Sequence, residues 1–198
     1  MSSVAEPAAL GPDGFVRKRW TVDDCRQMID SGLLAPGSFE LIEGEVISKM
    51  GQGRLHIAVV TRIMTALAIV FGAEVIQSQA PIGIGDTDEY NDPEPDAAVL
   101  RERVTAYVDR EPDPAADVLL VVEAAVSSLP GDLGAKARIY GSHGVQEYWV
   151  VSGERRELIV FRGPGPLGYA SMTVFGESES AAPMSSPESL VRVADLLA

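Results

Sequence analysis

The chain has 198 residues, of which 46% are hydrophobic and 23% are charged, a composition typical of one globular domain and too apolar for a disordered chain. Its net charge of −13 argues against a broad basic face that would hold nucleic acid nonspecifically. Cys25 is the only cysteine, and His56 and His143 are the only histidines, which excludes a disulfide framework or thiolate cluster and leaves carboxylates as the ligands for any metal.

The N-terminal residues mix Ala, Pro, Gly and charge without periodicity. We expect residues 1–18 to form a flexible leader and residues 19–198 to form a single domain. The leader lacks the apolar core of a signal peptide, and no uncharged apolar run approaches the roughly 18 residues that cross a membrane. These features favour a cytoplasmic protein that does not enter a membrane.

A short helix, a hairpin and a long helix are predicted next. Thr21 followed by two acids is typical of a capped helix start. Two extended apolar runs flank Glu43–Gly44, which predicts a hairpin. From His56 to Phe71 the apolar residues recur at three- and four-residue steps, which predicts a helix with a wide buried stripe that ends at Gly72.

The rest of the chain alternates apolar runs with breaks. Residues 75–84 predict a strand interrupted at Pro81, and residues 85–95 predict a polar, acidic loop. The remaining predicted elements are strands at 97–100, 118–126, 147–151, 157–161 and 169–175, a helix at 132–140, and a short strand with a helical turn at 190–197. This pattern predicts a mixed sheet with a few helices, in the α+β or α/β class.

Two acidic residues stand where burial makes a charge costly. Glu123 follows five consecutive aliphatic residues in the most apolar run, and Asp96 directly precedes the strand at 97–100. If these two strands are neighbours, the carboxylates could meet at one edge of the sheet, where they would repel each other unless a cation such as Mg²⁺ lay between them. The alternatives are that Glu123 is solvated at the end of its strand and that Asp96 caps a turn in a loop.

Lys136 lies four residues after Asp132 on the predicted helix, and the chain has 13 arginines but only three lysines. The spacing fits a surface ion pair. It also fits an ammonium that folds back over the strand end, where it could orient an attacking water and stabilise the charge on a phosphate. The spacing alone leaves both interpretations open.

Several motifs occur in a fixed order along the chain. They are Phe39-Glu40-Leu41-Ile42-Glu43-Gly44-Glu45-Val46, His56, Pro95-Asp96, Val121-Val122-Glu123, Asp132 with Lys136 and Tyr140, and Gly144-Val145-Gln146-Glu147-Tyr148-Trp149-Val150-Val151. Together they resemble the Uma-two family of restriction endonucleases, which belongs to the PD-(D/E)xK nuclease superfamily. The resemblance runs from about residue 20 to residue 162 and includes the C-terminal segment at 186–197.

The resemblance implies a restriction-endonuclease-like fold, a mixed β-sheet flanked by helices, and an endonuclease that uses Mg²⁺, or Mn²⁺ in its place, to hydrolyse phosphodiester bonds of DNA. It implies that Asp96 and Glu123 are metal ligands and that Lys136 is the catalytic lysine, displaced from the strand to the following helix. It also implies that Glu40 is an accessory acid. His56, at the start of the long helix, is either a further site residue or a surface residue that begins the helix.

Two features depart from the family pattern. Residues 124–130 lack the family's Ser-Pro-Ser-Thr type turn, and the acidic charge disfavours long-range attraction of a DNA duplex. A catalytically silent binding module with a nuclease fold, or a metal-dependent hydrolase of a small phosphate ester, therefore remains an alternative. A homodimer is expected, because nucleases that cut two strands often need two sites.

Overall fold

The computed structural model describes residues 16–49, 53–126 and 128–198, so most of the expected leader at 1–18 lies outside the described residues. The elements in chain order are α1 (Val22–Asp30), β1 (Phe39–Ile42), β2 (Glu45–Ser48), α2 (Arg54–Phe71), a 3₁₀ turn (Ala73–Val75), β3 (Ile76–Gln77), β4 (Ala97–Leu100), a second 3₁₀ turn (Val104–Tyr107), β5 (Val118–Ala125), α3 (Leu129–Gly131), a π-helical turn (Asp132–Lys136), α4 (Ala137–Ser142), β6 (Glu147–Ser152), β7 (Glu157–Gly165), β8 (Gly168–Gly176), β9 (Ser180–Ala181), β10 (Val191–Arg192) and α5 (Val193–Leu196).

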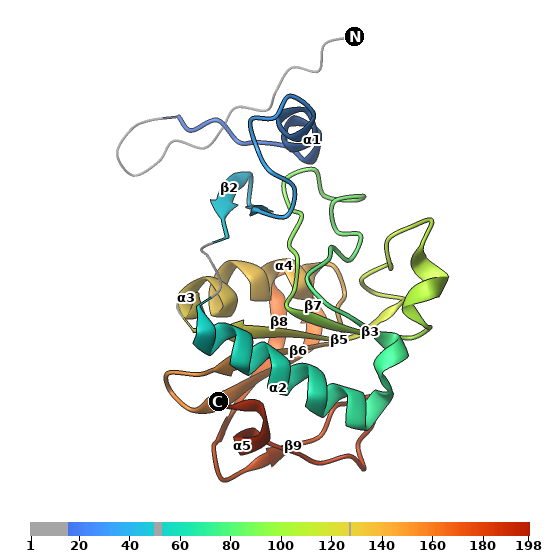
Figure 1. The fold of residues 1–198 in the computed structure, drawn as a ribbon, viewed down its shortest axis with the longest axis vertical. Helices are drawn as coiled ribbons and strands as arrows, with labels where there is room; N and C mark the ends of the chain where they lie inside the picture. Colours follow the sequence, from blue (N-terminus) through green and yellow to red (C-terminus); the bar gives the residue numbers. More distant parts are fainter. Residues whose placement is uncertain (1–15, 50–52, 127) are drawn as a thin grey trace.

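Six strands form one mixed sheet in the order β3-β4-β5-β6-β7-β8 (Figure 1). β5 and β6 run parallel, and the other neighbouring pairs run antiparallel. β4 and β5 are neighbours, with Ala97 opposite Val122. This register places the residue that precedes β4 opposite the residue that follows Val122, which are Asp96 and Glu123. The expected mixed sheet flanked by helices is therefore confirmed.

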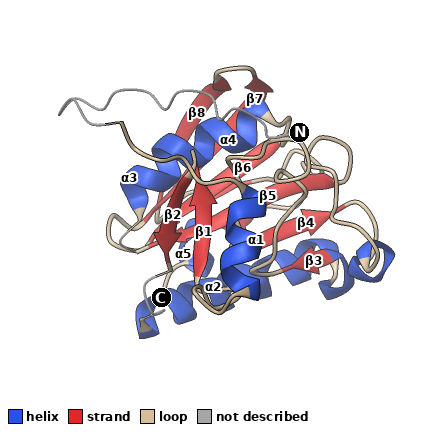
Figure 2. Ribbon diagram, turned by 90° about the horizontal axis from the view of Figure 1, so that it is seen from above, coloured by secondary structure: helices blue, strands red, loops and turns tan. Residues whose placement is uncertain are grey.

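Helices cover both faces of this sheet (Figures 1 and 2). On one face Val59 and Ile63 of α2 belong to the same apolar cluster as Val122, together with residues of α5. On the other face Tyr140 of α4 belongs to the cluster that contains Val121. Successive residues of β5 thus point into different clusters, and this explains why its apolar run is continuous rather than alternating.

A smaller layer built from α1 and the β1–β2 hairpin lies above the sheet in Figure 1. Its apolar centre is formed by Val22, Cys25 and Leu41. Backbone hydrogen bonds tie it to the acidic loop, including Asp92 N to Leu41 O at 2.8 Å. The hairpin turns at Glu43–Gly44, where both residues have positive φ angles of 52° and 80°, as in a tight two-residue turn.

Helix α2 has the length and composition of a membrane span, although Arg54 and Arg62 lie within it, and it is the one such helix found in the described ranges. Its residues Val59, Ile63 and Leu67 are almost completely buried in the core beneath the sheet. One face of α2 therefore packs against the sheet, while Leu55, Ile57 and Ile69 are exposed.

The strand predicted at 75–84 is wrong beyond Gln77. Only Ile76–Gln77 pairs with the sheet, as β3. The Gln77 amide nitrogen donates hydrogen bonds to the carbonyls of Ala80 and Pro81, which curls the chain away from the sheet edge. Ile82 and Ile84 are nevertheless fully buried. The apolar residues of this segment therefore indicate burial in the core and not a strand.

The helix predicted at 132–140 begins earlier, at Leu129, and contains the π-helical turn. Its α4 segment packs directly against β8. A Cβ atom at Gly141 would lie only 2.5 Å from the backbone of Gly168, so this contact requires a glycine. The close packing holds Lys136 and Tyr140 over the end of β5, beside Glu123.

Candidate functional site

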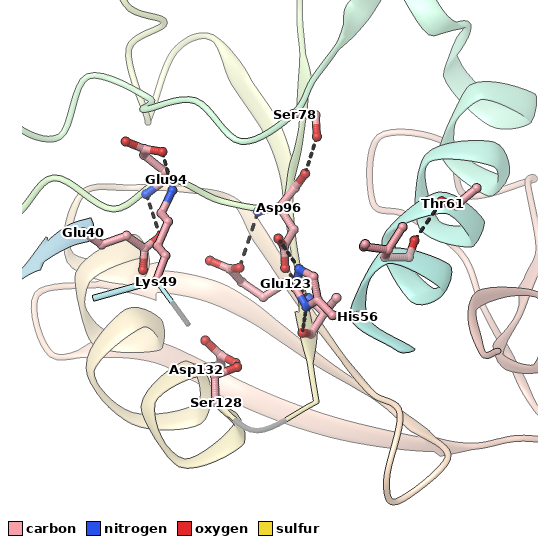
Figure 3. A network of polar contacts seen from close by, with 12 residues as sticks. Glu40, Lys49, His56, Thr61, Ser78, Glu94, Asp96, Glu123, Ser128 and Asp132 are labelled. Carbon is pink, nitrogen blue, oxygen red and sulfur yellow. Dashed lines mark hydrogen bonds and ion pairs between the residues drawn. The ribbon is translucent and has the colours of Figure 1, made fainter. Parts of the chain in front are cut away.

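Asp96 and Glu123 meet at the strand edge where the sequence analysis placed them (Figure 3). The Asp96 backbone N–H faces Glu123 Oε2 at 3.4 Å, and the Ala124 N–H donates to Asp96 Oδ2 at 2.8 Å. Both residues are buried, with 9% and 4% of their surface exposed. The two alternatives, a solvated strand end and a loop acid at the surface, are therefore not found.

Lys136 points into this pair rather than to the surface. Its Nζ atom lies 2.8 Å from Glu123 Oε1 and 3.0 Å from Glu40 Oε2, whereas Asp132, the partner expected for a surface ion pair, is 4.0 Å away. Burial alone would lower the pKa of Lys136, but the charges of Glu123, Glu40 and Asp132 outweigh it and raise that pKa above its usual value. The amine is therefore a permanent cation at neutral pH.

Two further contacts hold the carboxylates in place. The Tyr140 hydroxyl donates to Glu123 Oε1 at 2.9 Å, on the same oxygen that faces Lys136. The backbone N–H of Glu94 donates to Glu40 Oε1 at 3.0 Å. The β1–β2 hairpin thus places Glu40 in contact with Lys136, which lies 96 residues further along the chain.

His56 lies on the other side of Asp96, at the start of α2. Its Nε2 atom is 3.2 Å from Asp96 Oδ1, and its Nδ1 atom is 3.2 Å from the carbonyl oxygen of Ala124. The hydrogen bond to Asp96 raises the pKa of His56 against the opposing effect of burial. The same contact helps to lower the pKa of Asp96, although burial alone would raise it. The ring is therefore tied to both strands rather than being a free surface residue.

Lys49 and Glu94 form an ion pair at the rim of the site, next to Glu40 (Figure 3). Neither residue stands out in the sequence as a candidate for the site. The scarcity of lysine was the available signal, because two of the three lysines in the chain form ion pairs in this region, Lys49 with Glu94 and Lys136 with Glu40.

The site carries more negative than positive groups. Four carboxylates, those of Glu40, Asp96, Glu123 and Asp132, surround Lys136, with His56 at one side. Burial and the neighbouring charges of Asp96, Asp132 and Glu40 raise the pKa of Glu123, while Lys136 opposes the shift. Such an excess of buried negative charge favours the binding of a cation.

The donor set suits a hard divalent ion. Within the described ranges, no three His, Cys, Asp or Glu side chains form a ready-made metal-ligating group. Glu123 Oε2 receives the 3.4 Å contact from the Asp96 backbone, and Asp96 Oδ1 keeps lone pairs beyond its 3.2 Å contact with His56, so each carboxylate has an oxygen that can also contact an ion. Mg²⁺ is often bound by one or two carboxylates, with water and substrate phosphate completing the shell. The residues present therefore fit such an ion.

Comparison with known proteins gives two findings. The model of the Uma2 family, described as "Putative restriction endonuclease", matches residues 23–194. The crystal structure of "a putative nuclease belonging to DUF820 from Anabaena variabilis ATCC 29413" aligns with a TM-score of 0.65 and 16% sequence identity, over 89% of this chain and 96% of that chain. A search of curated proteins gives no match.

The solved structure, at this low identity, supports the fold alone. The family match extends further, because it covers all five candidate residues from Glu40 to Lys136 and both layers of the molecule. The resemblance drawn from the spaced motifs is thereby confirmed, and the chain belongs to the Uma2 family of restriction-endonuclease-like proteins.

Proposed function

We propose that the chain is a metal-dependent endonuclease that hydrolyses phosphodiester bonds of DNA. The observation that supports it most strongly is the convergence of Asp96, Glu123 and Lys136, which come from three separate elements. Two carboxylates and a permanent cation at one strand edge are the groups that phosphodiester hydrolysis needs.

Asp96 and Glu123 are the proposed ligands of Mg²⁺, with Mn²⁺ as a substitute. When bound, the ion polarises a phosphate oxygen and lowers the pKa of a water molecule. The Tyr140 hydroxyl and Lys136 occupy Glu123 Oε1, which turns Oε2 toward Asp96. His56 holds Asp96 from the opposite side.

Lys136 acts in this proposal as a donor and not as a base. Because its pKa is raised, it keeps its proton and can donate a hydrogen bond to a phosphoryl oxygen, where it stabilises the charge that develops in the transition state. Glu40 contacts the same ammonium at 3.0 Å and keeps it over the site. In the proposed reaction Glu40 is the accessory acid that orients Lys136 and the attacking water.

Plasmid nicking in Mg²⁺ or Mn²⁺ tests this proposal. Asp96→Ala and Lys136→Ala should each abolish metal-dependent nicking, because each removes a group that acts on the reacting phosphate. Lys18→Ala is the matched control, since Lys18 pairs with Asp24 on an exposed surface and should leave nicking unchanged. Nicking that survives both site substitutions would place the activity elsewhere.

The net charge of −13 favours a second candidate, a metal-dependent hydrolase of a small phosphate ester. A small ester needs no extended basic surface, whereas a duplex does. Hydrolysis of a small phosphodiester with no cleavage of DNA would favour this function. A catalytically silent module would show neither activity, even though it binds the metal.

We infer that the protein is a homodimer formed through the edge strand β8. This strand has nine residues, none of them charged, and exposes Met172 and Val174. Natural sheets usually protect such an edge with charges or proline. Val174→Lys should convert the dimer to a monomer in light scattering, while Leu167→Lys, on the preceding turn, should not.

We also propose that the protein is cytoplasmic, since the apolar stripe of α2 is used in the core and DNA is the proposed substrate. Fractionation of cells that produce the full chain should recover it in the cytosol. Recovery with the membranes would contradict this location.

A further inference from the structure

A cavity of about 220 Å³ lies between α1, the strand β1 and the segment that leads to Asp96. Its apolar walls include Val22, Ile29, Phe39 and Leu41, and its polar side is formed by Arg26, Asp92 and Glu94. Pockets for drug-sized molecules have volumes of about 300–1,000 Å³. The size of this cavity therefore suits one small ring system rather than a larger ligand.

Glu94 joins the cavity to the candidate site. Its backbone N–H donates to Glu40, and its carboxylate pairs with Lys49. Residues 92–96 read Asp-Pro-Glu-Pro-Asp, and the prolines favour an extended backbone for the residues before them. At roughly 3.3 Å per extended residue, Asp92 lies at most about 13 Å along the chain from Asp96. A ligand in the cavity would thus be close to a phosphate held at Asp96.

The Asp92 carboxylate lacks a donor, unlike its neighbours. Lys49 pairs with Glu94, and the Gly83 N–H donates to Glu111 at 2.8 Å, but no residue in the described ranges donates a hydrogen bond to the Asp92 side chain. Burial, followed by the charges of Glu111 and Glu94, raises the pKa of Asp92 to about 6. A half-buried carboxylate that no described residue donates to has both oxygens available to accept hydrogen bonds from a ligand with N–H groups.

The walls and the acceptor together specify the chemistry of a ligand. Phe39 and the aliphatic side chains suit the faces of a planar ring, and enzymes that extrude a base read its edge by hydrogen bonds and its faces by such contacts. An ionised carboxylate accepts two parallel hydrogen bonds. Guanine presents two adjacent donors, N1–H and the 2-amino group, whereas adenine and cytosine each present one donor beside an acceptor.

We propose that this cavity binds a single guanine base, turned out of the nucleic acid beside the reacting phosphate, with its N1–H and 2-amino groups donating to Asp92. The proposal rests on the proposed nuclease function for its substrate, but the binding itself needs neither metal nor cleavage. It assigns a base-recognition role to the small layer formed by α1 and the hairpin.

Guanosine is a suitable probe, because it carries the base without a phosphate that the acidic surface would repel. We would titrate guanosine, adenosine and cytidine into the full metal-free chain at pH 7.5 and follow binding by NMR shifts. Guanosine should bind at least about ten times more tightly than the other two nucleosides, which corresponds to about 1.4 kcal/mol. Equal binding of the three, or no binding of guanosine, would overturn the proposal.

Asp92→Asn should weaken guanosine binding at least about tenfold, because the amide offers one acceptor where the carboxylate offers two. Glu89→Gln is the matched control, since it makes the same charge change in the acidic loop at an exposed residue that does not line the cavity. Ile29→Trp, which places a larger side chain in the cavity and keeps the acid, is the second variant should Asp92→Asn fail to fold. Unchanged guanosine binding in a folded Asp92→Asn or Ile29→Trp protein would refute this site.

The outcomes separate this proposal from the proposed function. Guanosine binding without any nuclease activity would leave the cavity assignment standing and remove the endonuclease. Nuclease activity in a chain that does not bind guanosine would do the reverse. Asp96→Ala, which should abolish cleavage, should keep guanosine binding, because Asp96 does not line the cavity.

Discussion

Glu123 and Glu147 are both buried glutamates, on the neighbouring parallel strands β5 and β6, yet their surroundings differ. Glu147 Oε1 accepts hydrogen bonds from Arg162 Nε at 2.8 Å and from the Trp149 indole at 3.0 Å, and its Oε2 accepts one from the Met184 N–H at 2.7 Å. Both carboxylate oxygens of Glu147 therefore accept hydrogen bonds, and the charge of Arg162 balances that of Glu147. Glu123 instead shares Lys136 with other carboxylates.

The difference separates a structural carboxylate from one suited to chemistry. A balanced buried pair needs no further ligand, and removing one partner strands the other charge. A buried carboxylate in a cluster with excess negative charge is destabilised until a cation arrives. The fold keeps Glu123 although its burial among other carboxylates lowers stability. Such a loss of stability is expected at sites where function requires an unfavourable charge.

The largest effect is expected from Glu123→Gln. This change removes a proposed metal ligand, and we expect metal-dependent nicking to fall about 10³-fold, equivalent to about 4 kcal/mol of barrier. The free energy of unfolding should stay within about 1 kcal/mol of wild type or rise, because one of several crowded charges is lost. Nicking rates and urea unfolding measure the two quantities. A large loss of stability would show that Glu123 is structural, like Glu147.

The opposite result is expected from Glu147→Gln. The amide nitrogen introduced by this change cannot accept the hydrogen bonds that the buried carboxylate accepts from Arg162, Trp149 and the Met184 N–H, so the free energy of unfolding should fall by about 2 kcal/mol. The rate of nicking per folded molecule should not change, since Glu147 makes no contact with the candidate site. Urea unfolding and an assay corrected for the folded fraction distinguish these outcomes. A specific loss of activity at full stability would contradict the assignment.

Much of this architecture is predictable because the apolar pattern is strong where burial is complete. The run at 118–126 is sufficient to predict β5, although it leaves open whether Glu123 is buried in the strand or solvated at its end. The three- and four-residue steps between 56 and 71 predict α2. The family resemblance implies that Asp96, Glu123 and Lys136 belong to one site. The roles of these residues remain predictions. The pattern itself cannot report which way Lys136 points.

Other features depend on tertiary contacts that leave no local signal. Glu40 reaches Lys136 only because the acidic loop anchors the hairpin above the sheet. The π-helical turn at 132–136 and the curl after Gln77 depend on packing and on side-chain hydrogen bonds. Asp92 looks like any acid in a polar loop, and only the folded structure shows that it faces a cavity.

Asp92 is a third kind of carboxylate in this comparison, one without a hydrogen-bond donor. The change in stability expected from its substitution is intermediate in size. Its pKa of about 6 lies above the ordinary 3.8, so the folded state holds a proton that the unfolded state has lost, and stability falls as pH rises from about 4 to about 6. Asp92→Asn should therefore be more stable than wild type by about 2 kcal/mol at pH 8, with no gain at pH 3. Urea unfolding at both pH values tests this, with Glu89→Gln in the same loop as the control. A gain that is independent of pH would show that charge is not its cause.

The smallest effect is expected from Tyr140→Phe, which tests whether the shared oxygen of Glu123 must be held. Tyr140 and Tyr148 are both fully buried, with ring centroids 5.0 Å apart and ring planes tilted by 58°, but Tyr140 donates to Glu123 while Tyr148 donates to the backbone carbonyl of Asp132. Loss of the Tyr140 hydroxyl frees Glu123 to rotate away from Asp96, and we expect Mn²⁺ affinity, measured by electron paramagnetic resonance, to fall about tenfold, or about 1.4 kcal/mol. Tyr148→Phe removes an equally buried hydroxyl that does not contact Glu123, so it should leave the Mn²⁺ affinity within about twofold. If the tyrosines only supported the packing of the core, the two variants would lose affinity alike. Equal losses in the two variants would mean that packing of the aromatic pair, rather than the hydrogen bond to Glu123, prepares the site for a cation.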